Sequence, residues 1–483
     1  MSLHIYNSLT KKKEPFVPLE GNVVKMYSCG VTVYDKCHIG HARSLYIFDV
    51  IRRYLKYRGY DVRFVRNITD IDDKIINKAR ELGVDSKDVA EKNIGLYYQD
   101  MDSLGVGKAD IEPRATENIN DMIRHIQGLI DSGAAYEAEG DVYFSVRKFP
   151  DYGKLSGQSI EKMLEGVRIE SDEKKRDPLD FALWKHSKEG EPSCGDSPPW
   201  WGPGRPGWHI ECSCMSLKHL RCETLDIHAG GRDLIFPHHE NEIAQAEALT
   251  GKPFAKYWIH HGLITINGQK MSKSLGNFIT VEDAVKRFGP DDLKLFFLAS
   301  HYSSPIDFSE EKIAEAHKAR QRFAVLAQDA ARLNGDAARL EPHPDAQSII
   351  DAAQAAFIEA MDDDFNTPKA LGVLFELVTD AHKYKGRPGA DYLVCQAFEM
   401  IQRLCENIFG VNVRFQTVSK ELKFVYNVNG ISVQKTVEEL LQERQEARKN
   451  KNFKKSDDLR VVLKEQHGII VEDTPQGQQW REE

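Results

Sequence analysis

The chain contains 483 residues, of which 41% are hydrophobic and 29% are charged, and its formal net charge is −9. This composition is typical of a folded globular protein and excludes a fibrous or wholly disordered chain. No stretch approaches the roughly 18 consecutive apolar residues of a membrane span, and no apolar segment follows the N-terminal lysines as in a secretory signal.

The length and the cysteines set two further expectations. At about 150 residues per domain, the chain has room for roughly three domains. Its eight cysteines are too sparse for a disulfide framework, so grouped cysteines are better interpreted as metal ligands or core residues of a reducing compartment. We therefore expect a cytoplasmic protein without membrane contact. Because the net charge is negative, contact with nucleic acid must depend on local basic patches.

The first part of the chain predicts an α/β fold. Residues 23–29 form an apolar, strand-like run, residues 42–57 carry apolar side chains at helical spacing, and residues 61–69 again resemble a strand. This βαβ order implies a parallel sheet with a ligand crevice beyond its strand ends. Strand-like sequence resumes at residues 225–227 and 257–266, so we expect the sheet to close there.

The interruption between these parts, residues 113–207, is interpreted as an insertion, because short strand-like and helix-like pieces alternate with segments rich in glycine and proline. Beyond residue 309 the amphipathic periodicity of alanine, leucine and charged residues predicts a helical bundle. One helix is expected to start at Asn366 or Thr367, just before Pro368.

The last part of the chain is less regular. Residues 411–436 are polar and β-prone, which fits an insert or a small sheet. Residues 448–455 carry five basic side chains on a helix-like segment. A basic helix can follow nucleic acid phosphates, although such a run is often only a solvated helical face.

The tetrapeptide His38-Ile39-Gly40-His41 lies between the first strand and its helix. Unpaired backbone N–H groups and the helix dipole favour a bound phosphate there. The imidazoles of His38 and His41 can donate hydrogen bonds to phosphoryl oxygens, and Gly40 leaves room for a flat group such as an adenine ring. Taken alone, the two histidines fit a plain helix cap equally well.

A second motif is the lysine-containing loop KMSKS, residues 270–274, which glycines flank on both sides. Lys270 and Lys273 suit the transient stabilisation of a departing pyrophosphate, because ammonium groups act as mobile point charges. Taken alone, such a loop is usually only solvated. The HIGH and KMSKS pair, about 230 residues apart, resembles the signature of class I aminoacyl-tRNA synthetases.

Four further residues could form a zinc site. Cys29 ends the first predicted strand, Cys212 lies in WHIECSCM, and His238 and Glu242 are four residues apart, which places them on one face of a helix. A single cysteine is more often a small buried hydrophobic residue. His239 lies about 100° around the helix from His238 and is the weaker candidate. The sequence HHENE is not the HExxH motif, so a zinc protease loses its main support.

Several segments together resemble cysteinyl-tRNA synthetases over nearly the whole chain. They are CGVTVYDKCHIGHAR, RNITDIDDKI, YGKLSG, KRDPLDFALWK, GRPGWHIECS, FPHHENEIAQ, GQKMSKSLGN, MDDDFNTPKAL and VEDTPQGQQW. The chain departs from the family pattern at Ala229, which occupies a glycine position. Cys194 and Cys214 are not family ligands and are expected to be structural.

The resemblance implies a set of site residues. One zinc ion per chain would bind the substrate thiolate through the ligands Cys29, Cys212, His238 and Glu242. Gly30, Thr69 and Trp208 would line the amino-acid pocket. ATP would be bound by His38, Gly40, His41, Lys270, Ser272 and Lys273, of which His38, His41, Lys270 and Lys273 would be catalytic.

The resemblance also implies the reaction. The carboxylate of L-cysteine attacks the α-phosphorus of ATP, Mg²⁺ accompanies the nucleotide, and the cysteinyl group then passes to the terminal ribose of cysteine tRNA. Zinc suits the selection of cysteine over serine, because shape alone separates such near-isosteres only weakly and the metal prefers a soft thiolate. Four protein ligands exceed the usual three of an open zinc site, so either the ion becomes five-coordinate or Glu242 loosens.

The implied architecture has five parts in one chain, which is expected to be a monomer. They are a Rossmann-like parallel-sheet catalytic domain (1–112 and 208–265), a connective insertion (113–207), the KMSKS loop and stem-contact region (266–310), a helical bundle (311–410) and a C-terminal anticodon-binding region (411–483).

Two other functions stay open from the sequence. A related ligase would join activated cysteine to an amino sugar, but such enzymes resemble only the catalytic half. A non-catalytic tRNA-binding paralogue would have no chemical reason to keep both HIGH and KMSKS.

Overall fold

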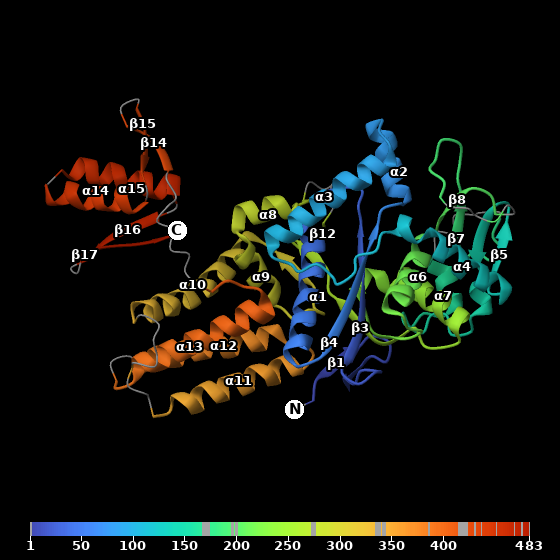
Figure 1. The fold of residues 1–483 in the computed structure, drawn as a ribbon, viewed down its shortest axis with the longest axis horizontal. Helices are drawn as coiled ribbons and strands as arrows, with labels where there is room; N and C mark the ends of the chain where they lie inside the picture. The colour runs from blue at the N-terminus through green and yellow to red at the C-terminus, as the bar shows by residue number, and fades with distance from the viewer. Residues whose placement is uncertain are drawn as a thin grey trace. The chain divides into compact units, whose positions relative to one another are not determined.

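The computed structural model divides the chain into two compact units, Met1–Val413 and Arg414–Glu483 (Figure 1). The structure describes residues 2–166, 174–194, 198, 201–271, 277–333, 340, 344–384, 387–413, 424–428, 431–435, 437–450, 452–467, 469–474 and 477–482. Within these ranges, no helix combines the length and the apolar character needed to cross a membrane.

The first unit is built on a four-stranded parallel sheet, which confirms the α/β prediction. Its order is β10 (Ala255–His261), β9 (Leu225–Gly231), β3 (Val23–Thr32) and β4 (Asp61–Thr69). Helix α1 (Ile39–Tyr57) makes the crossover between β3 and β4. The chain leaves the sheet after β4 and returns as β9 on the other side of β3, which is the topology that opens a ligand crevice beside β3.

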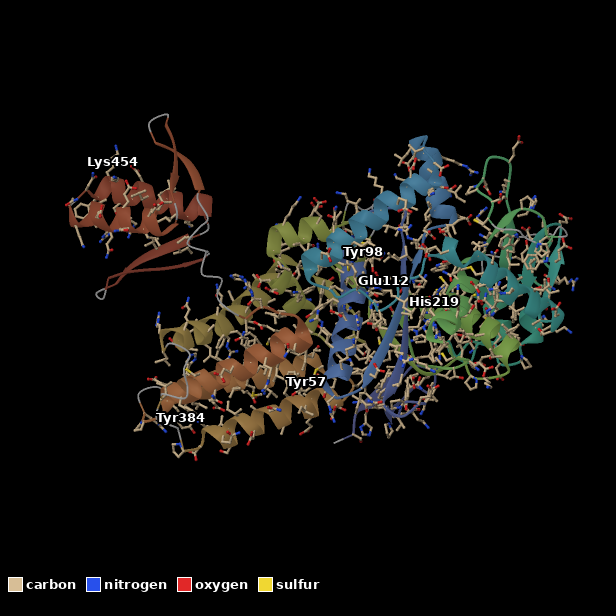
Figure 2. All side chains as sticks on the ribbon, viewed as in Figure 1. Tyr57, Tyr98, Glu112, His219, Tyr384 and Lys454 are labelled. Carbon is tan, nitrogen blue, oxygen red and sulfur yellow. The ribbon has the colours of Figure 1, made fainter. Side chains whose placement is uncertain are left out.

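Helices flank this sheet, and a hairpin precedes it. The elements are β1 (His4–Asn7), β2 (Lys12–Pro15), α2 (Asp73–Leu82), α3 (Ser86–Leu104), η1 (Ala115–Asn118), α6 (Trp208–Leu220), η3 (Arg232–Leu234), η4 (Ile235–His239) and α7 (Glu240–Thr250). Glu112, labelled in Figure 2, accepts a 2.6 Å hydrogen bond from Arg66 of β4, and both side chains are buried. This ion pair ties the segment after α3 to the sheet.

The segment interpreted as an insertion forms its own antiparallel sheet in the order β5-β6-β7-β8. Its elements are α4 (Ile119–Asp131), β5 (Ala135–Ala138), β6 (Asp141–Phe144), η2 (Val146–Lys148), α5 (Ile160–Gly166), β7 (Phe181–His186) and β8 (Gly204–Pro206). Trp184 and Trp201 are fully buried with ring centroids 6.0 Å apart, so both tryptophans pack inside this sheet's core.

A small three-stranded sheet and the helical bundle complete the first unit. The small sheet and its helices are β11 (Ile264–Ile266), β12 (Gln269–Lys270), α8 (Val281–Phe288), α9 (Pro290–Leu298) and β13 (Ile306–Phe308). The bundle follows as α10 (Glu310–Arg332), α11 (Ala346–Asp362), α12 (Thr367–Lys383), α13 (Ala390–Leu404) and η7 (Cys405–Phe409). As the proline suggested, α12 starts at Thr367, and Asn366 caps it by accepting from the Lys369 N–H.

The second unit has a small core of its own. It contains the hairpin β14 (Phe424–Val428) and β15 (Ile431–Lys435), helices α14 (Val437–Lys449) and α15 (Phe453–His467), and the hairpin β16 (Ile469–Thr474) and β17 (Gly477–Glu482). Leucines from both helices pack against Ile469 and Val471. The β-prone stretch at 411–436 therefore contributes a two-stranded sheet, and much of the basic run lies on α14 and α15.

Candidate active site

Four buried side chains meet beside the parallel sheet. Cys29 comes from β3, Cys212 from α6, His238 from η4 and Glu242 from α7, and none is more than 9% exposed. One potential ligand atom from each lies within 4.8 Å of the other three. Two thiols, an imidazole and a carboxylate make a donor set that suits zinc.

The unmet bonding capacity of His238 supports this interpretation. Its buried Nε2 has no hydrogen-bond partner among the described residues, although it lies 3.0 Å from Glu242 Oε1. A nitrogen without a hydrogen bond at this depth is costly unless something else coordinates it. The residues therefore fit a metal ion bound between them.

Two further histidines contact two of these potential ligands, His238 and Glu242. His209 Nδ1 lies 2.8 Å from His238 Nδ1, which leaves His238 Nε2 directed at the cluster. His228 Nε2 lies 2.7 Å from Glu242 Oε2, and both side chains are fully buried. Such outer contacts fix the ring orientation and the tautomer of a metal-binding histidine.

His239 lies closer to the cluster than the sequence suggested. Its Nε2 is 3.3 Å from Cys29 Sγ, and Cys29, His228, His239 and Glu242 form a second set within 4.8 Å. The expected angle of about 100° holds only for a regular helix through His238. Phe236 instead has φ −138° and ψ 133°, so the chain bends before α7 and both imidazoles reach the same region.

The electrostatics of the cluster favour bound cations. Burial opposes ionisation of Glu242, but the charges of His228 and His238 outweigh it and hold the pKa of this carboxyl well below its usual range. Burial, together with the Cys212 sulfur, raises the pKa of Cys29. Burial also opposes ionisation of Cys212, yet the hydrogen bond from Cys29 and the charge of His238 lower its pKa. One thiolate and one carboxylate are thus available to a metal near neutral pH.

The expected pocket residues contact the cluster or residues adjacent to it. Trp208 stacks on the His238 ring with centroids 4.0 Å apart and remains 37% exposed. Thr69 donates to Glu211 at 2.7 Å. Gly30 permits close contact between two strands, because a Cβ there would lie 1.6 Å from the Asn67 carbonyl oxygen.

Asn67 and Glu211 are site residues that the sequence interpretation did not single out. The Asn67 side-chain oxygen accepts from the Tyr27 hydroxyl at 2.9 Å and from the Gly30 N–H at 2.8 Å, and its nitrogen donates to Thr69. Burial raises the pKa of Glu211 well above its usual range. Both residues lie within the RNITDIDDKI and GRPGWHIECS segments, which was the available signal.

The first turn of α1 shows how the HIGH motif is held. His38 is the N-cap of α1, and its Nδ1 accepts from the Gly40 and His41 N–H groups at 3.0 and 3.4 Å. His41 Nδ1 accepts from the His38 N–H at 3.3 Å, and the two rings stack with centroids 3.8 Å apart. Because both Nδ1 atoms accept, each imidazole carries its proton on Nε2, the nitrogen that can donate to a phosphate.

Two details refine the interpretation of this motif. A Cβ on Gly40 would lie 2.8 Å from the His38 ring, so the glycine is needed for the cap itself. Burial and the His38 charge lower the pKa of His41 to about 3, so His41 is a neutral donor at physiological pH.

The start of the KMSKS motif lies on the small sheet. Lys270 belongs to β12, which pairs with β11. Ser272 and Lys273 lie outside the described residues. After the loop, the chain contacts the HIGH segment directly, since the Ile39 N–H donates to the Ile279 carbonyl at 3.2 Å and the Val281 N–H donates to the Cys37 carbonyl at 2.9 Å.

A groove of about 840 Å³ opens beside Trp208 and His209. Its lining includes Tyr143 of β6, Phe181 and Lys185 of β7, Arg205 of β8, Arg80 of α2 and, after β7, Lys188, together with the carboxylates of Asp72, Asp73, Asp141 and Glu191. Arg205, Lys185 and Arg80 pair with Asp73 and Glu191 of the same lining. Aromatic rings together with lysines are typical of a surface that binds single-stranded nucleic acid.

Three family models match the chain. A tRNA synthetase class I (C) catalytic domain matches residues 15–318, a DALR domain matches residues 356–413, and a cysteinyl-tRNA ligase anticodon binding domain matches residues 432–481.

Curated relatives match over the full length. A "Cysteine--tRNA ligase" of Geobacillus sp. (strain WCH70) is 50% identical over 481 residues, with 99% of each chain covered. One of Persephonella marina is 50% identical over 494 residues, with all of both chains covered.

Solved structures show the same fold at low sequence identity. A Mycobacterium tuberculosis methionyl-tRNA synthetase with methionyl-adenylate matches with a TM-score of 0.64 and 16% identity, over 81% of this chain and 92% of that one. An Agrobacterium radiobacter K84 LeuRS in a ternary complex matches with a TM-score of 0.59 and 13% identity, over 88% and 92%.

Proposed function

The chain belongs to the family of cysteinyl-tRNA synthetases, and from this premise we propose which of its residues act on each substrate. It is an ATP-dependent ligase that activates L-cysteine as cysteinyl-adenylate and transfers the cysteinyl group to cysteine tRNA. The observation that carries the assignment of residues is the buried cluster of two thiols, an imidazole and a carboxylate beside the parallel sheet.

We assign selection of the amino acid to this cluster. Cys29, Cys212, His238 and Glu242 would hold one zinc ion, which supplies a soft Lewis acid that prefers the substrate thiolate to a serine hydroxyl. Gly30, Thr69 and Trp208 complete the pocket. The Asn67 network holds Gly30 and Thr69 in place, so the pocket is formed before cysteine binds.

We assign the chemistry of adenylation to the two ATP motifs. The cysteine carboxylate attacks the α-phosphorus in line, the bond to the β-phosphate oxygen breaks, and pyrophosphate departs with Mg²⁺. His38 and His41 donate Nε2–H groups to phosphoryl oxygens, and Gly40 leaves space beside the adenine. Lys270, Ser272 and Lys273 stabilise the pyrophosphate as its charge develops.

We assign tRNA binding to two separate surfaces. The groove beside Trp208 would receive the single-stranded acceptor end, because its aromatic rings can stack on bases while its lysines neutralise phosphates. The second unit, which matches the anticodon-binding family model, would read the anticodon. An amino-sugar ligase would need neither surface.

We also infer the compartment and the oligomeric state of the enzyme. All eight cysteines are free, and the site requires reduced thiols, which supports a cytoplasmic enzyme. The first unit contains both the amino-acid cluster and the HIGH motif, so a monomer would suffice for activation.

The test is cysteine-dependent exchange of pyrophosphate into ATP with serine as competitor, followed by addition of cysteine tRNA. We expect exchange that serine does not inhibit, and cysteinyl-tRNA after tRNA addition. Exchange without transfer would contradict the assignment of the tRNA-binding surfaces, and inhibition by equimolar serine would contradict selection by the thiolate cluster.

A further inference from the structure

Arg43 lies on α1 two residues after His41 and is completely buried. Its guanidinium group bonds backbone oxygens from two separate segments. Nη1 donates to the carbonyls of Gly262 (2.7 Å) and Leu263 (3.1 Å), and Nη2 donates to those of Ser304 (2.6 Å), Tyr302 (3.2 Å) and His301 (3.5 Å). Within the described part of the chain, no carboxylate forms an ion pair with it.

A buried cation without a counter-ion is an expensive feature. Burial lowers the pKa of Arg43 to about 10, so the guanidinium group is still charged at neutral pH. Its planar array of donors can bridge two chain segments at once, which an ammonium group cannot reproduce. The arrangement therefore serves to hold those segments in a fixed position relative to α1.

The two segments form the base of the KMSKS hairpin. Residues 262–263 lead directly into β11 and β12, which carries Lys270. Residues 301–304 lead into β13, which pairs with β11. The Gly262 N–H donates to the Tyr302 carbonyl at 2.9 Å, and a Cβ on Gly262 would lie 2.2 Å from the Ser304 oxygen. Arg43 thus connects α1, the helix that begins with the HIGH motif, to the residues that lead into the KMSKS loop.

The residues that follow that loop contact the start of the same helix. The Ile39 N–H bonds the Ile279 carbonyl, and the Val281 N–H bonds the Cys37 carbonyl. The residues before and after the KMSKS loop are consequently both held next to the HIGH helix, residues 262–263 by Arg43 and residues 279–281 by backbone hydrogen bonds.

We propose that Arg43 is a positioning residue that sets the distance between the HIGH histidines and the hairpin bearing Lys270. The inference rests on the proposed assignment of His38, His41 and Lys270 to ATP. Arg43 touches no substrate in this role. Because both motifs must reach one triphosphate, a shift of about 1 Å can cost roughly 100-fold in rate.

The test compares steady-state pyrophosphate exchange, zinc content and unfolding temperature in full-length variants. Arg43→Lys keeps the charge but loses the bridging geometry, and Gly262→Ala pushes the same two segments apart while leaving Arg43 intact. We expect both to lower kcat at least tenfold, to raise the KM for ATP, and to leave the KM for cysteine and the zinc content within twofold. Arg58→Lys is the matched control, because Arg58 caps the far end of the same helix and bonds Asp362, and this variant should keep kcat within twofold.

A Lys270→Ala variant distinguishes the assignment of Lys270 to ATP from the positioning role of Arg43. If it leaves exchange unchanged, the assignment of Lys270 fails and the role of Arg43 fails with it. If Lys270→Ala is impaired but Arg43→Lys and Gly262→Ala exchange at the wild-type rate, only the positioning role is overturned. A parallel rise in the KM for cysteine, or failure of both variants to fold, would show a general structural role and would also overturn it.

Discussion

Cys212 and Cys214 illustrate how the turn of one helix separates a ligand from a core residue. Both lie in α6 and both are buried. Two positions along a helix differ by about 200°, so the side chains face opposite ways. Cys212 faces the cluster with Cys29, whereas burial raises the pKa of Cys214 to about 12 and keeps it a neutral thiol.

Alanine substitutions of these two cysteines should therefore differ sharply. We expect Cys212→Ala to lose tight zinc binding and at least 100-fold of cysteine-dependent pyrophosphate exchange, because one of the two sulfur donors is gone. Cys214→Ala should keep both properties and lose only about 1 kcal/mol of stability as a small buried side chain is shortened. Metal analysis and exchange assays on both proteins check this. Full exchange by a zinc-free Cys212→Ala protein would reject the ligand assignment.

At the scale of elements, the inserted sheet is joined to the catalytic fold by a network of charges. Asp73 at the start of α2 pairs with Lys185 of β7 at 2.6 Å and also with Arg205 of β8. Glu191 pairs with Arg205 and with Arg80 of α2, both at 2.8 Å. Arg205 and Glu191 are mostly buried, which strengthens these pairs relative to ordinary surface contacts.

The network predicts a defined pH dependence. Burial opposes ionisation of Glu191, but hydrogen bonds from Arg205, the Lys188 backbone and Arg80 outweigh it and lower the pKa to about 2. A carboxyl with a lowered pKa stabilises the fold above its ordinary pKa of about 4.5, and this contribution is lost as the pH falls towards 2.

Glu191→Gln should consequently unfold at a lower temperature than the wild type at pH 7. The difference should stay constant down to about pH 5 and narrow below about pH 4.5, because Glu191 of the unfolded chain then takes up a proton while the folded-state carboxylate stays ionised until the pH approaches 2. Thermal unfolding of both proteins across this range measures it. A difference that does not change between pH 7 and pH 4 would mean that the charge of Glu191 contributes nothing.

At the scale of the whole molecule, the chain divides at Val413 into two compact units with separate cores. The first unit contains the thiolate cluster and the HIGH motif, and the second has a separate core formed by α14, α15 and β16. Two cores of this kind are expected to fold independently.

A protein ending at Val413 should therefore activate cysteine but charge tRNA poorly. We expect pyrophosphate exchange within about twofold of the full chain, because no residue of the ATP or cysteine site is removed. The kcat/KM for tRNA should fall at least tenfold, since a whole binding surface is lost. Parallel exchange and aminoacylation assays on the two proteins check this. Undiminished tRNA charging would contradict a role of the second unit in binding tRNA.

The amino-acid sequence by itself determined the elements whose signals are local. Hydrophobic periodicity predicted the βαβ unit, and the observed β4 (Asp61–Thr69) coincides with the expected strand. The proline at 368 marked the start of α12. The HIGH and KMSKS motifs and the segment FPHHENEIAQ, which contains His238 and Glu242, also indicated the family. Each is a contiguous run of residues, so it can be recognised without the tertiary structure.

Only the tertiary structure decided which distant residues act together. His228, His239, Asn67 and Glu211 join the site through contacts across the sheet, and Arg43 bonds residues more than 200 positions away. Such contacts depend on the strand order and on local bends such as the one at Phe236, which displaced His239 from its expected helical angle. Periodicity carries no information about them, because it reports which face of an element is buried and not what that face meets.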